Sequence, residues 1–129
     1  MTALTVATYY GHAHILQTLL LCGANVDYAD DEGCTALHEA AGEGHAMCVW
    51  ILLNHELGPN VNARDVDDDT PLINAAASGH ATIVAQLIQH GAVLDIRNRH
   101  GMSALDVCMN TECWEELKLG PGFGDMRLA

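Results

Sequence analysis

The stretch Asp30–His45, DDEGCTALHEAAGEGH, carries the signals of a short capped helix. Thr35 is a good N-cap, because its hydroxyl can accept from the first backbone N–H groups of a helix, which have no partner inside it. The alanines at positions 40 and 41 are small and let neighbouring helices approach closely. Gly44 can adopt the left-handed backbone that ends many helices. The stretch therefore predicts one helix that starts after Thr35 and stops at the Gly-His dipeptide.

The same pattern returns before and after this stretch. Gly-His pairs begin at residues 11, 44 and 79, which are 33 and then 35 positions apart. Apolar residues at helical spacing follow each pair and predict a second helix, which ends at a further glycine. The helix starts share a hydroxyl residue, at Thr2, Thr35, Thr70 and Ser103. One such unit cannot bury its apolar stripe alone, so the units must stack.

This pattern resembles the ankyrin repeat, most fully in DDEGCTALHEAAGEGH and again in TPLINAAASGH from Thr70 to His80. The resemblance covers nearly the whole chain, from Thr2 to about Leu119. It implies an all-α fold, an ankyrin-repeat solenoid of stacked helix–turn–helix units with β-hairpin-like loops on one side. We expect an ankyrin repeat domain over 1–119, a flexible C-terminal tail over 120–129, and repeats at about 1–29, 30–64, 65–97 and 98–119.

Each unit departs from the family pattern somewhere. The first lacks its preceding hairpin, which favours the alternative of a piece of a longer array. The second has two extra residues between Leu53 and Gly58. Asp68 stands where the third hairpin should have glycine, and aspartate tolerates an unusual backbone better than most residues. The fourth loses its Gly-His and ends in ECWEELKL, a mixture of acids and apolar residues that suits a capping helix.

The composition indicates one acidic domain. Half of the 129 residues are apolar, which is enough to build a core. Seventeen acids against five Lys and Arg residues give a net charge of −12 at pH 7. Phosphate backbones and anionic lipids repel such a chain, so we expect neither nucleic-acid nor membrane binding. Its natural complement is a basic segment of another protein, and we expect the chain itself to be a monomer.

The five cysteines are odd in number and include no CxxC pair. This argues against a disulfide framework and a zinc site, and for reduced thiols in an intracellular compartment, cytoplasmic or nuclear. Cys48 lies on an apolar stripe and is expected in the core. Cys34 is expected to be exposed at a hairpin, which makes it the thiol to test for reactivity.

Asp65, Asp67 and Asp69 fit the first half of a calcium-binding loop. The sixth position of that motif should be glycine but is Thr70, and the twelfth should be glutamate but is Ala76. A solvated hairpin tip, with Asp69 beside a helix N-terminus that favours negative charge, fits the residues better. A metal- or nucleotide-using enzyme at this aspartate run remains the rival hypothesis from another class.

The resemblance also implies roles for single residues. Histidines at the position of His38, and at the position shared by His12, His45 and His80, bond to the backbone between neighbouring repeats in this family, so we expect structural histidines and no catalytic residue, metal or cofactor. Asparagines at the hairpin position of Asn62 are hydroxylated in some family members, which makes Asn62 a candidate for hydroxylation.

Ankyrin arrays bind partners through a concave face built from hairpin tips and the exposed side of each first helix. On this chain the surface would run from aromatic through acidic to basic, a composition typical of a protein interface. We therefore expect a non-catalytic protein–protein interaction module, with a structural spacer or fragment of a longer array as the alternative. The residues that the register places on this face are Tyr9, Tyr10, Ala29, Asp31, Glu32, Cys34, Gly42, Glu43, Arg64, Val66, Asp67, Asp69, Ala77, Ser78, Arg97, Arg99, His100, Met102, Asn110 and Thr111.

Overall fold

The computed structural model describes residues 2–56, 58–108 and 110–118, and the expected tail over 120–129 lies outside this part of the chain. The described residues form helices joined by turns, without a strand, which confirms the all-α fold. The helices are α1 (Ala3–Tyr9), α2 (Ala13–Leu21), α3 (Ala36–Glu43), α4 (Ala46–Leu53), α5 (Pro71–Ala77), α6 (Ala81–Gln89), α7 (Ala104–Val107) and α8 (Thr111–Lys118).

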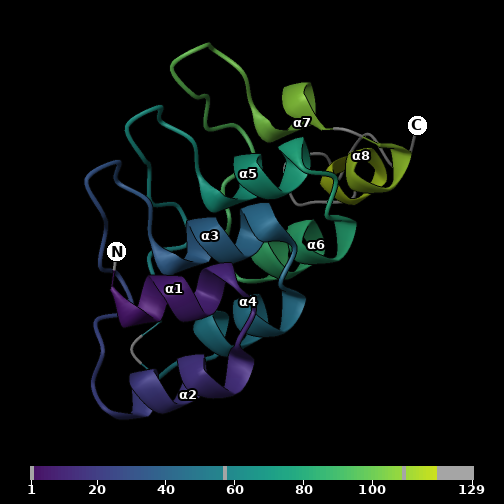
Figure 1. Cartoon of the computed structure of the whole chain (residues 1–129). Coiled ribbons are helices and arrows are strands. Elements are labelled where there is room, and N and C mark those ends of the chain that lie inside the picture. Colours follow the sequence, from purple (N-terminus) through teal and green to yellow (C-terminus); the bar gives the residue numbers. More distant parts are fainter. Residues whose placement is uncertain (1, 57, 109, 119–129) are drawn as a thin grey trace.

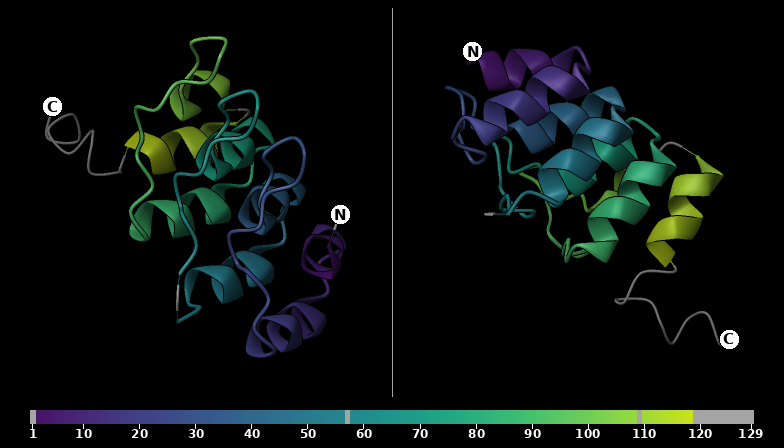
Figure 2. Two further views of the ribbon diagram at one scale, coloured as in Figure 1. Left: turned by 90° about the vertical axis from the view of Figure 1, so that its left-hand side faces the viewer. Right: turned by 90° about the horizontal axis from the view of Figure 1, so that it is seen from below.

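The helices lie in two layers (Figure 1). The inner layer holds α1, α3, α5 and α7, each packed on the next, and the outer layer holds α2, α4, α6 and α8 in the same order. Loops extend from one side of the inner layer, and the helix pairs follow one another in a row (Figures 1 and 2). The expected stack of helix–turn–helix units is confirmed.

The predicted caps begin the inner helices. The hydroxyls of Thr2, Thr35 and Thr70 each accept from the backbone N–H three residues on. Ser103 and Asp106 form a reciprocal capping box at α7. Because these bonds satisfy N–H groups that a helix leaves without partners, each unit starts at a defined residue.

Glycine and histidine lock neighbouring units together. Gly44 has a left-handed backbone, with φ 81°, and a Cβ added there would lie 2.6 Å from Cε1 of His80 in the next unit. Gly11 lies against His45 in the same way, and Nε2 of His45 donates to the Tyr9 carbonyl oxygen at 2.8 Å. Each glycine thus leaves room for a histidine ring of the next unit, and the ring of His45 also bonds back to the preceding unit.

The second expected histidine has the same kind of role. Nδ1 of His38 accepts from the Thr35 backbone N–H at 3.2 Å, so Nε2 carries the proton and donates to the Asp69 carbonyl oxygen at 2.8 Å. His38 thereby ties the start of α3 to the next hairpin. The structural roles expected of His38 and His45 are confirmed.

The fourth unit replaces its missing histidine with Asn110. This residue stands directly before α8, accepts from the Cys113 N–H at 2.8 Å, and donates from Nδ2 to the Gly79 carbonyl oxygen at 3.0 Å. One side chain therefore caps the last outer helix and bonds to the preceding unit.

Candidate protein-interaction surface

Three hairpins precede α3, α5 and α7. In each of them, one side-chain oxygen accepts the hydrogen bonds that hold the turn. Oδ1 of Asp30, Asp65 and Asn98 accepts from two backbone N–H groups, two and four residues further on, at 2.9 to 3.1 Å. These bonds close the turn from within. Asp65, which the sequence offered as a metal ligand, is therefore a structural residue of its hairpin.

The left-handed position of the third unit's hairpin is occupied by Asp68, with φ 59°. Gly33 and Gly101, each with φ 76°, fill this place in the other two hairpins. The unusual backbone expected at Asp68 is confirmed. Because only glycine adopts this region without steric cost, Asp68 stores strain that its neighbours do not.

Backbone bonds join the three hairpins into a continuous edge. The N–H of Val66 donates to the Glu32 carbonyl oxygen, and the N–H of Arg99 donates to the Asp67 carbonyl oxygen, both at 2.9 Å. Consecutive hairpins therefore keep a fixed spacing, and their exposed side chains form one surface. We call this surface, together with the exposed residues of α1, α3 and α5, the hairpin face.

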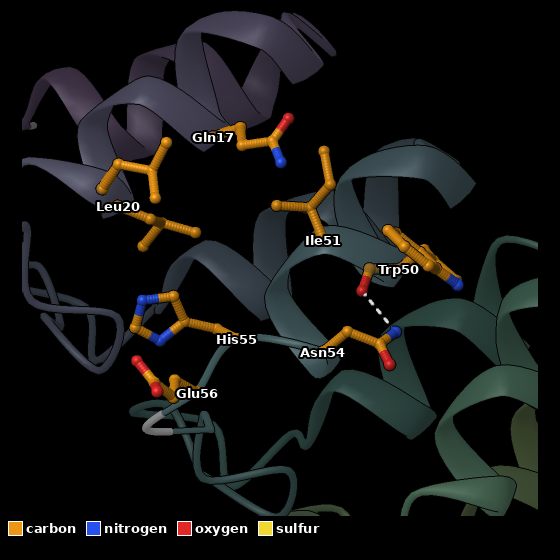
Figure 3. Close-up of a pocket in the computed structure, with 8 residues that line it drawn as sticks. Gln17, Leu20, Trp50, Ile51, Asn54, His55 and Glu56 are labelled. Atoms are coloured by element: carbon orange, nitrogen blue, oxygen red, sulfur yellow. Dashed lines mark hydrogen bonds between the residues drawn. The ribbon is translucent and has the colours of Figure 1, made fainter.

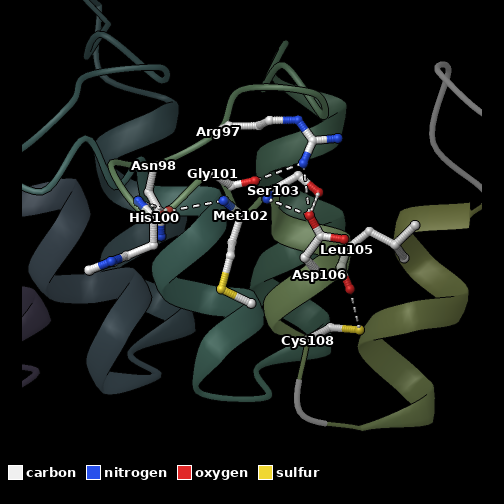
Figure 4. A network of polar contacts seen from close by, with 9 residues as sticks. All are labelled: Arg97, Asn98, His100, Gly101, Met102, Ser103, Leu105, Asp106 and Cys108. Atoms are coloured by element: carbon white, nitrogen blue, oxygen red, sulfur yellow. Dashed lines mark hydrogen bonds and ion pairs between the residues drawn. The ribbon is translucent and has the colours of Figure 1, made fainter.

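Ion pairs neutralise part of the hairpin face from within the chain. Arg99 donates to the Asp67 carboxylate at 3.0 Å. Arg97 donates to the Gly101 carbonyl oxygen at 2.8 Å and to the Asp106 carboxylate at 3.1 Å (Figure 4). Hydrogen bonds from Ser103, helped by Arg97, lower the pKa of Asp106 below its usual range. Of the basic side chains that the sequence placed at one end, Arg99 thus binds an acid of the hairpin face and Arg97 binds an acid of α7.

The acids of the second unit have no such compensation. Asp31, Glu32 and Glu43 are exposed, and neither of the two ion pairs in the described part of the chain includes them. Glu39, on α3, is half-buried between them, and burial together with Asp30, Glu43 and Glu32 raises the pKa of its carboxyl. The sequence does not single out Glu39, because the burial of its side chain depends on how the hairpin folds over α3. On the hairpin face, the exposed acids without an ion pair therefore lie on the second unit.

Two aromatic side chains stand beside this acidic region. Tyr9 and Tyr10 at the end of α1 are exposed and meet edge to face, with ring centroids 5.0 Å apart. They precede Gly42 and Glu43 by one 33-residue repeat, and α1 packs directly on α3. Tyrosine rings of this kind, partly apolar and tipped by a hydroxyl, are frequent anchors in interfaces.

The other residues expected on this face occupy turns or helix ends. Cys34, Gly42, Asp67 and Asp69 are half-buried. The exposed members are Ala29, Arg64, Val66, Ala77, Ser78, Arg97, Arg99, His100, Met102, Asn110 and Thr111. Their use in binding stays a prediction.

The expectation that Cys34 is exposed, which made it the thiol to test for reactivity, is wrong. Cys34 is half-buried, and burial together with Asp30, Asp65, Glu39 and Glu32 raises the pKa of its thiol to about 12. The reactive thiolate is therefore disfavoured at neutral pH. The hairpin of the next unit brings Asp65 beside it, which one unit of sequence does not reveal. Cys48 is buried as expected, and Cys22 is the exposed thiol.

The aspartate run already binds protein donors. Ligand atoms of Asp65, Asp67 and Asp69 lie within 4.8 Å of one another, close enough to share a cation. However, Asp65 accepts from two backbone N–H groups, Asp67 from Arg99, and Asp69 from Asn98 at 3.0 Å. These donors compete with a cation for the same oxygens and favour the structural interpretation.

Asn62 also uses its side chain between units. Oδ1 accepts from the Val93 N–H at 2.8 Å, and Nδ2 donates to the Gly91 carbonyl oxygen at 3.3 Å. The side chain is therefore held against the loop after α6. Hydroxylation of Asn62 stays a prediction.

A family model, described as ankyrin repeats in three copies, matches residues 1–65 and 57–120. The chain belongs to the ankyrin repeat family. No helix in the described part of this ankyrin chain is both long and apolar enough to cross a membrane.

Similar proteins contain the match as a small part of a longer chain. This ankyrin chain is 53% identical over 53 residues to E3 ubiquitin-protein ligase XBAT33 of Arabidopsis thaliana. The matched segment covers 40% of this chain and 10% of that protein. The probable E3 ubiquitin-protein ligase XBOS32 of Oryza sativa subsp. japonica is 49% identical over 53 residues, covering 40% and 11%. Ankyrin repeat and KH domain-containing protein CBG24701 of Caenorhabditis briggsae is 35% identical over 109 residues, covering 84% and 4%.

Proposed function

We propose that this ankyrin chain is a non-catalytic protein–protein interaction module that binds a partner through the hairpin face. The observation that carries the proposal is the uncompensated charge of the second unit. Asp31, Glu32, Glu39 and Glu43 gather there beside Tyr9 and Tyr10, whereas Asp67 of the next hairpin is paired with Arg99. Repeat proteins use extended surfaces of this kind for binding.

The partner segment is basic. Acidic side chains at the rim steer a cationic segment and set the association rate and its salt dependence more than the final affinity. The tyrosines supply apolar contact area beside this charge. The free thiols of all five cysteines support an intracellular location, cytoplasmic or nuclear.

The experiment compares acids of the hairpin face that have no ion pair within the chain with an exposed acid on another surface. Affinity capture from a cell lysate with wild-type protein identifies candidate partners, whose dissociation constants are then measured for purified variants. Glu32→Gln combined with Glu43→Gln should weaken binding and reduce its salt dependence. Glu112→Gln, on the exposed side of α8, is the control and should leave binding unchanged.

The variant pair suggested by the sequence, Asp67→Lys with Asp69→Lys, should also weaken binding. Because Asp67 is bound to Arg99 and Asp69 to Asn98, those changes additionally disturb the hairpins. Circular dichroism must therefore show an unchanged helical signal. Binding that is indifferent to all four acids would exclude the hairpin face as the site.

A second candidate function is that of a segment within a longer array, and the end of the stack favours it. Ile15 is 53% exposed, whereas the residues at its register in the next units, Cys48 and Ile83, are each 1% exposed. The relatives above are also much longer than this chain. Sedimentation equilibrium and thermal unfolding test this candidate. A cooperative monomer indicates an autonomous module, whereas self-association or early unfolding indicates a dependent segment.

Two further tests address the remaining hypotheses. A calorimetric titration with Ca²⁺ and Mg²⁺ would overturn the ranking if it showed tight, stoichiometric binding at Asp65, Asp67 and Asp69. Mass spectrometry of the peptide that contains Asn62 would reveal hydroxylation as a mass increase that depends on a 2-oxoglutarate oxygenase.

A further inference from the structure

The outer helices of the first three units are uncharged. The sequences AHILQTLLL of α2, AMCVWILL of α4 and ATIVAQLIQ of α6 contain no Asp, Glu, Lys or Arg, although the whole chain has a net charge of −12. Their outward sides form a surface of a different kind from the acidic hairpin face. We call it the outer face.

Large apolar side chains project from this outer face. Trp50 is 53% exposed, Met47 is 62% exposed and Leu21 is 82% exposed. One repeat away, the position of Trp50 holds Gln17 or Ala85, and the position of Met47 holds His14 or Thr82. The two side chains are thus departures of the second unit from smaller or more polar residues.

Trp50 stands between two hollows. One, of about 390 Å³, lies between α2 and the end of α4, with Leu20 and Ile51 along its sides and His55 and Glu56 at one end (Figure 3). Gln17, Leu21 and Asn54 also line it. The other, of about 300 Å³, is lined by Ala46, Met47 and Gln86 on the side of α6. Trp50 lines both. Each volume is at the lower end of the range for ligand-binding pockets.

We propose that the outer face is a second docking site, which takes an uncharged amphipathic helix of a partner protein across Trp50, with one apolar side chain in each hollow. An exposed tryptophan flanked by two hollows with apolar side chains in their walls is the composition of an interface hot spot. This site is independent of the hairpin face, since the two surfaces differ in charge and in the helix layer that forms them.

The distribution of charge favours an uncharged helix of a partner over a charged segment or a second copy of the chain. A charged segment that covered α2, α4 and α6 would lose its hydration without gaining an opposite charge from these helices, since Glu56 stands at one end of one hollow only. A second copy of the chain would bring another molecule of net charge −12 close to the first, which long-range repulsion opposes. A helix recognised by spaced apolar anchors fits a groove between helices, whereas an extended segment needs a free strand edge, which the described residues do not provide.

The test uses a fluorescein-labelled synthetic peptide of about 18 residues, five helical turns, with leucines on one face and Gln, Ala and Ser elsewhere. Fluorescence anisotropy measures its binding to the full chain. We expect the amphipathic peptide to bind, and a scrambled peptide of the same composition to bind at least about tenfold more weakly. Trp50→Gln should weaken binding by about thirtyfold, the smallest effect that defines a hot-spot residue.

Two controls separate the outer face from other effects. Leu21 is the most exposed of the three side chains, so Leu21→Gln should also weaken binding. This variant takes the place of Trp50→Gln in the test if Trp50→Gln changes the melting curve of the chain. Glu43→Gln on the hairpin face should leave peptide binding unchanged. In a Trp114→Phe background, the fluorescence of Trp50 should shift to shorter wavelength when the unlabelled peptide binds, because the indole loses water contact.

Three results overturn the proposal. These are equal binding of the scrambled peptide, binding unaffected by both Trp50→Gln and Leu21→Gln, and self-association of the free chain that Trp50→Gln abolishes. The last would assign the face to a second copy. None of them bears on the hairpin face, which is tested by its own acid variants.

Discussion

Arg99 donates to Asp67 twice, from its backbone N–H to the carbonyl oxygen at 2.9 Å and from Nη1 to the carboxylate at 3.0 Å. The backbone bond fixes the spacing between the two hairpins, and this spacing brings the guanidinium beside the acid. Asp67 is therefore compensated by the next unit along the stack. The negative charge left for a partner lies one unit earlier, at Glu32 and Glu43.

We expect the Arg99–Asp67 ion pair to contribute little to stability. The two side chains are 59% and 50% exposed, and exposed pairs contribute about 0–1 kcal/mol. A double-mutant cycle of Arg99→Gln and Asp67→Asn, measured by urea unfolding, should give a coupling below about 1 kcal/mol that falls as salt is added. A cycle with Arg64→Gln in place of Arg99→Gln is the control. A larger coupling that persists at high salt would contradict this expectation.

We expect Gly44→Ala to destabilise the chain more than Gly23→Ala. Both glycines have a left-handed backbone, with φ 81° and 91°, so both variants carry the same conformational strain. A Cβ at position 44 would also meet the His80 ring at 2.6 Å, whereas one at position 23 would meet nothing within 4 Å. Thermal unfolding should show a cost of about 1 kcal/mol for Gly23→Ala and about 2–3 kcal/mol for Gly44→Ala. Equal costs would mean that the His80 ring moves aside freely.

Asp68→Gly should stabilise the third unit's hairpin. Asp68 has φ 59°, a conformation that costs about 1 kcal/mol for a residue with a side chain, less for aspartate than for most. Glycine removes this cost but adds freedom to the unfolded chain, so the expected net gain is about 0.5 kcal/mol. Asp68→Asn removes the same charge while keeping the side chain, and it separates the effect of strain from that of charge. A gain of equal size in both variants would assign the effect to charge.

The helix caps and helix stops in the sequence predicted the helix pairs because the same kinds of residue recur in each unit. The N-cap at Thr35, the stop at Gly44 and the rings of His38 and His45 involve short segments or one step of the repeat. A wrong assignment in one unit would have conflicted with the register of the others. This redundancy is why the helix pairs and their stacking could be predicted.

Features that depend on exact distances between units were not predictable in the same way. The depth of Cys34 depends on Asp65, from the next hairpin, and the compensation of Asp67 depends on Arg99. On α4, the apolar run AMCVWILL is continuous, and the register of the other units places the buried stripe at Cys48, Val49, Leu52 and Leu53, as the structure confirms. The hollows on the two sides of Trp50 depend on how α4 packs on its neighbours and were not predictable.

Glu39 and Asp106 should give stability opposite dependences on pH. The pKa of Glu39 is raised above its ordinary value of 4.5, by burial first and then by neighbouring acids. Its ionised form is therefore disfavoured in the folded chain, and a destabilising effect develops as pH rises above 4.5. The pKa of Asp106 is lowered below 3.8 by bonds from Ser103, so its stabilising effect is present above pH 3.8 and is lost as pH falls through the lowered value.

The variants Glu39→Gln and Asp106→Asn separate the two effects in urea unfolding at several pH values. At pH 7, Glu39→Gln should raise the free energy of unfolding and Asp106→Asn should lower it. Between pH 7 and pH 4, the gain from Glu39→Gln should shrink toward zero, because the wild-type carboxyl becomes protonated. The loss from Asp106→Asn should persist over that range, because the wild-type carboxylate stays ionised. A gain from Glu39→Gln that is the same at pH 4 would show that the carboxyl's size, and not its charge, causes the effect.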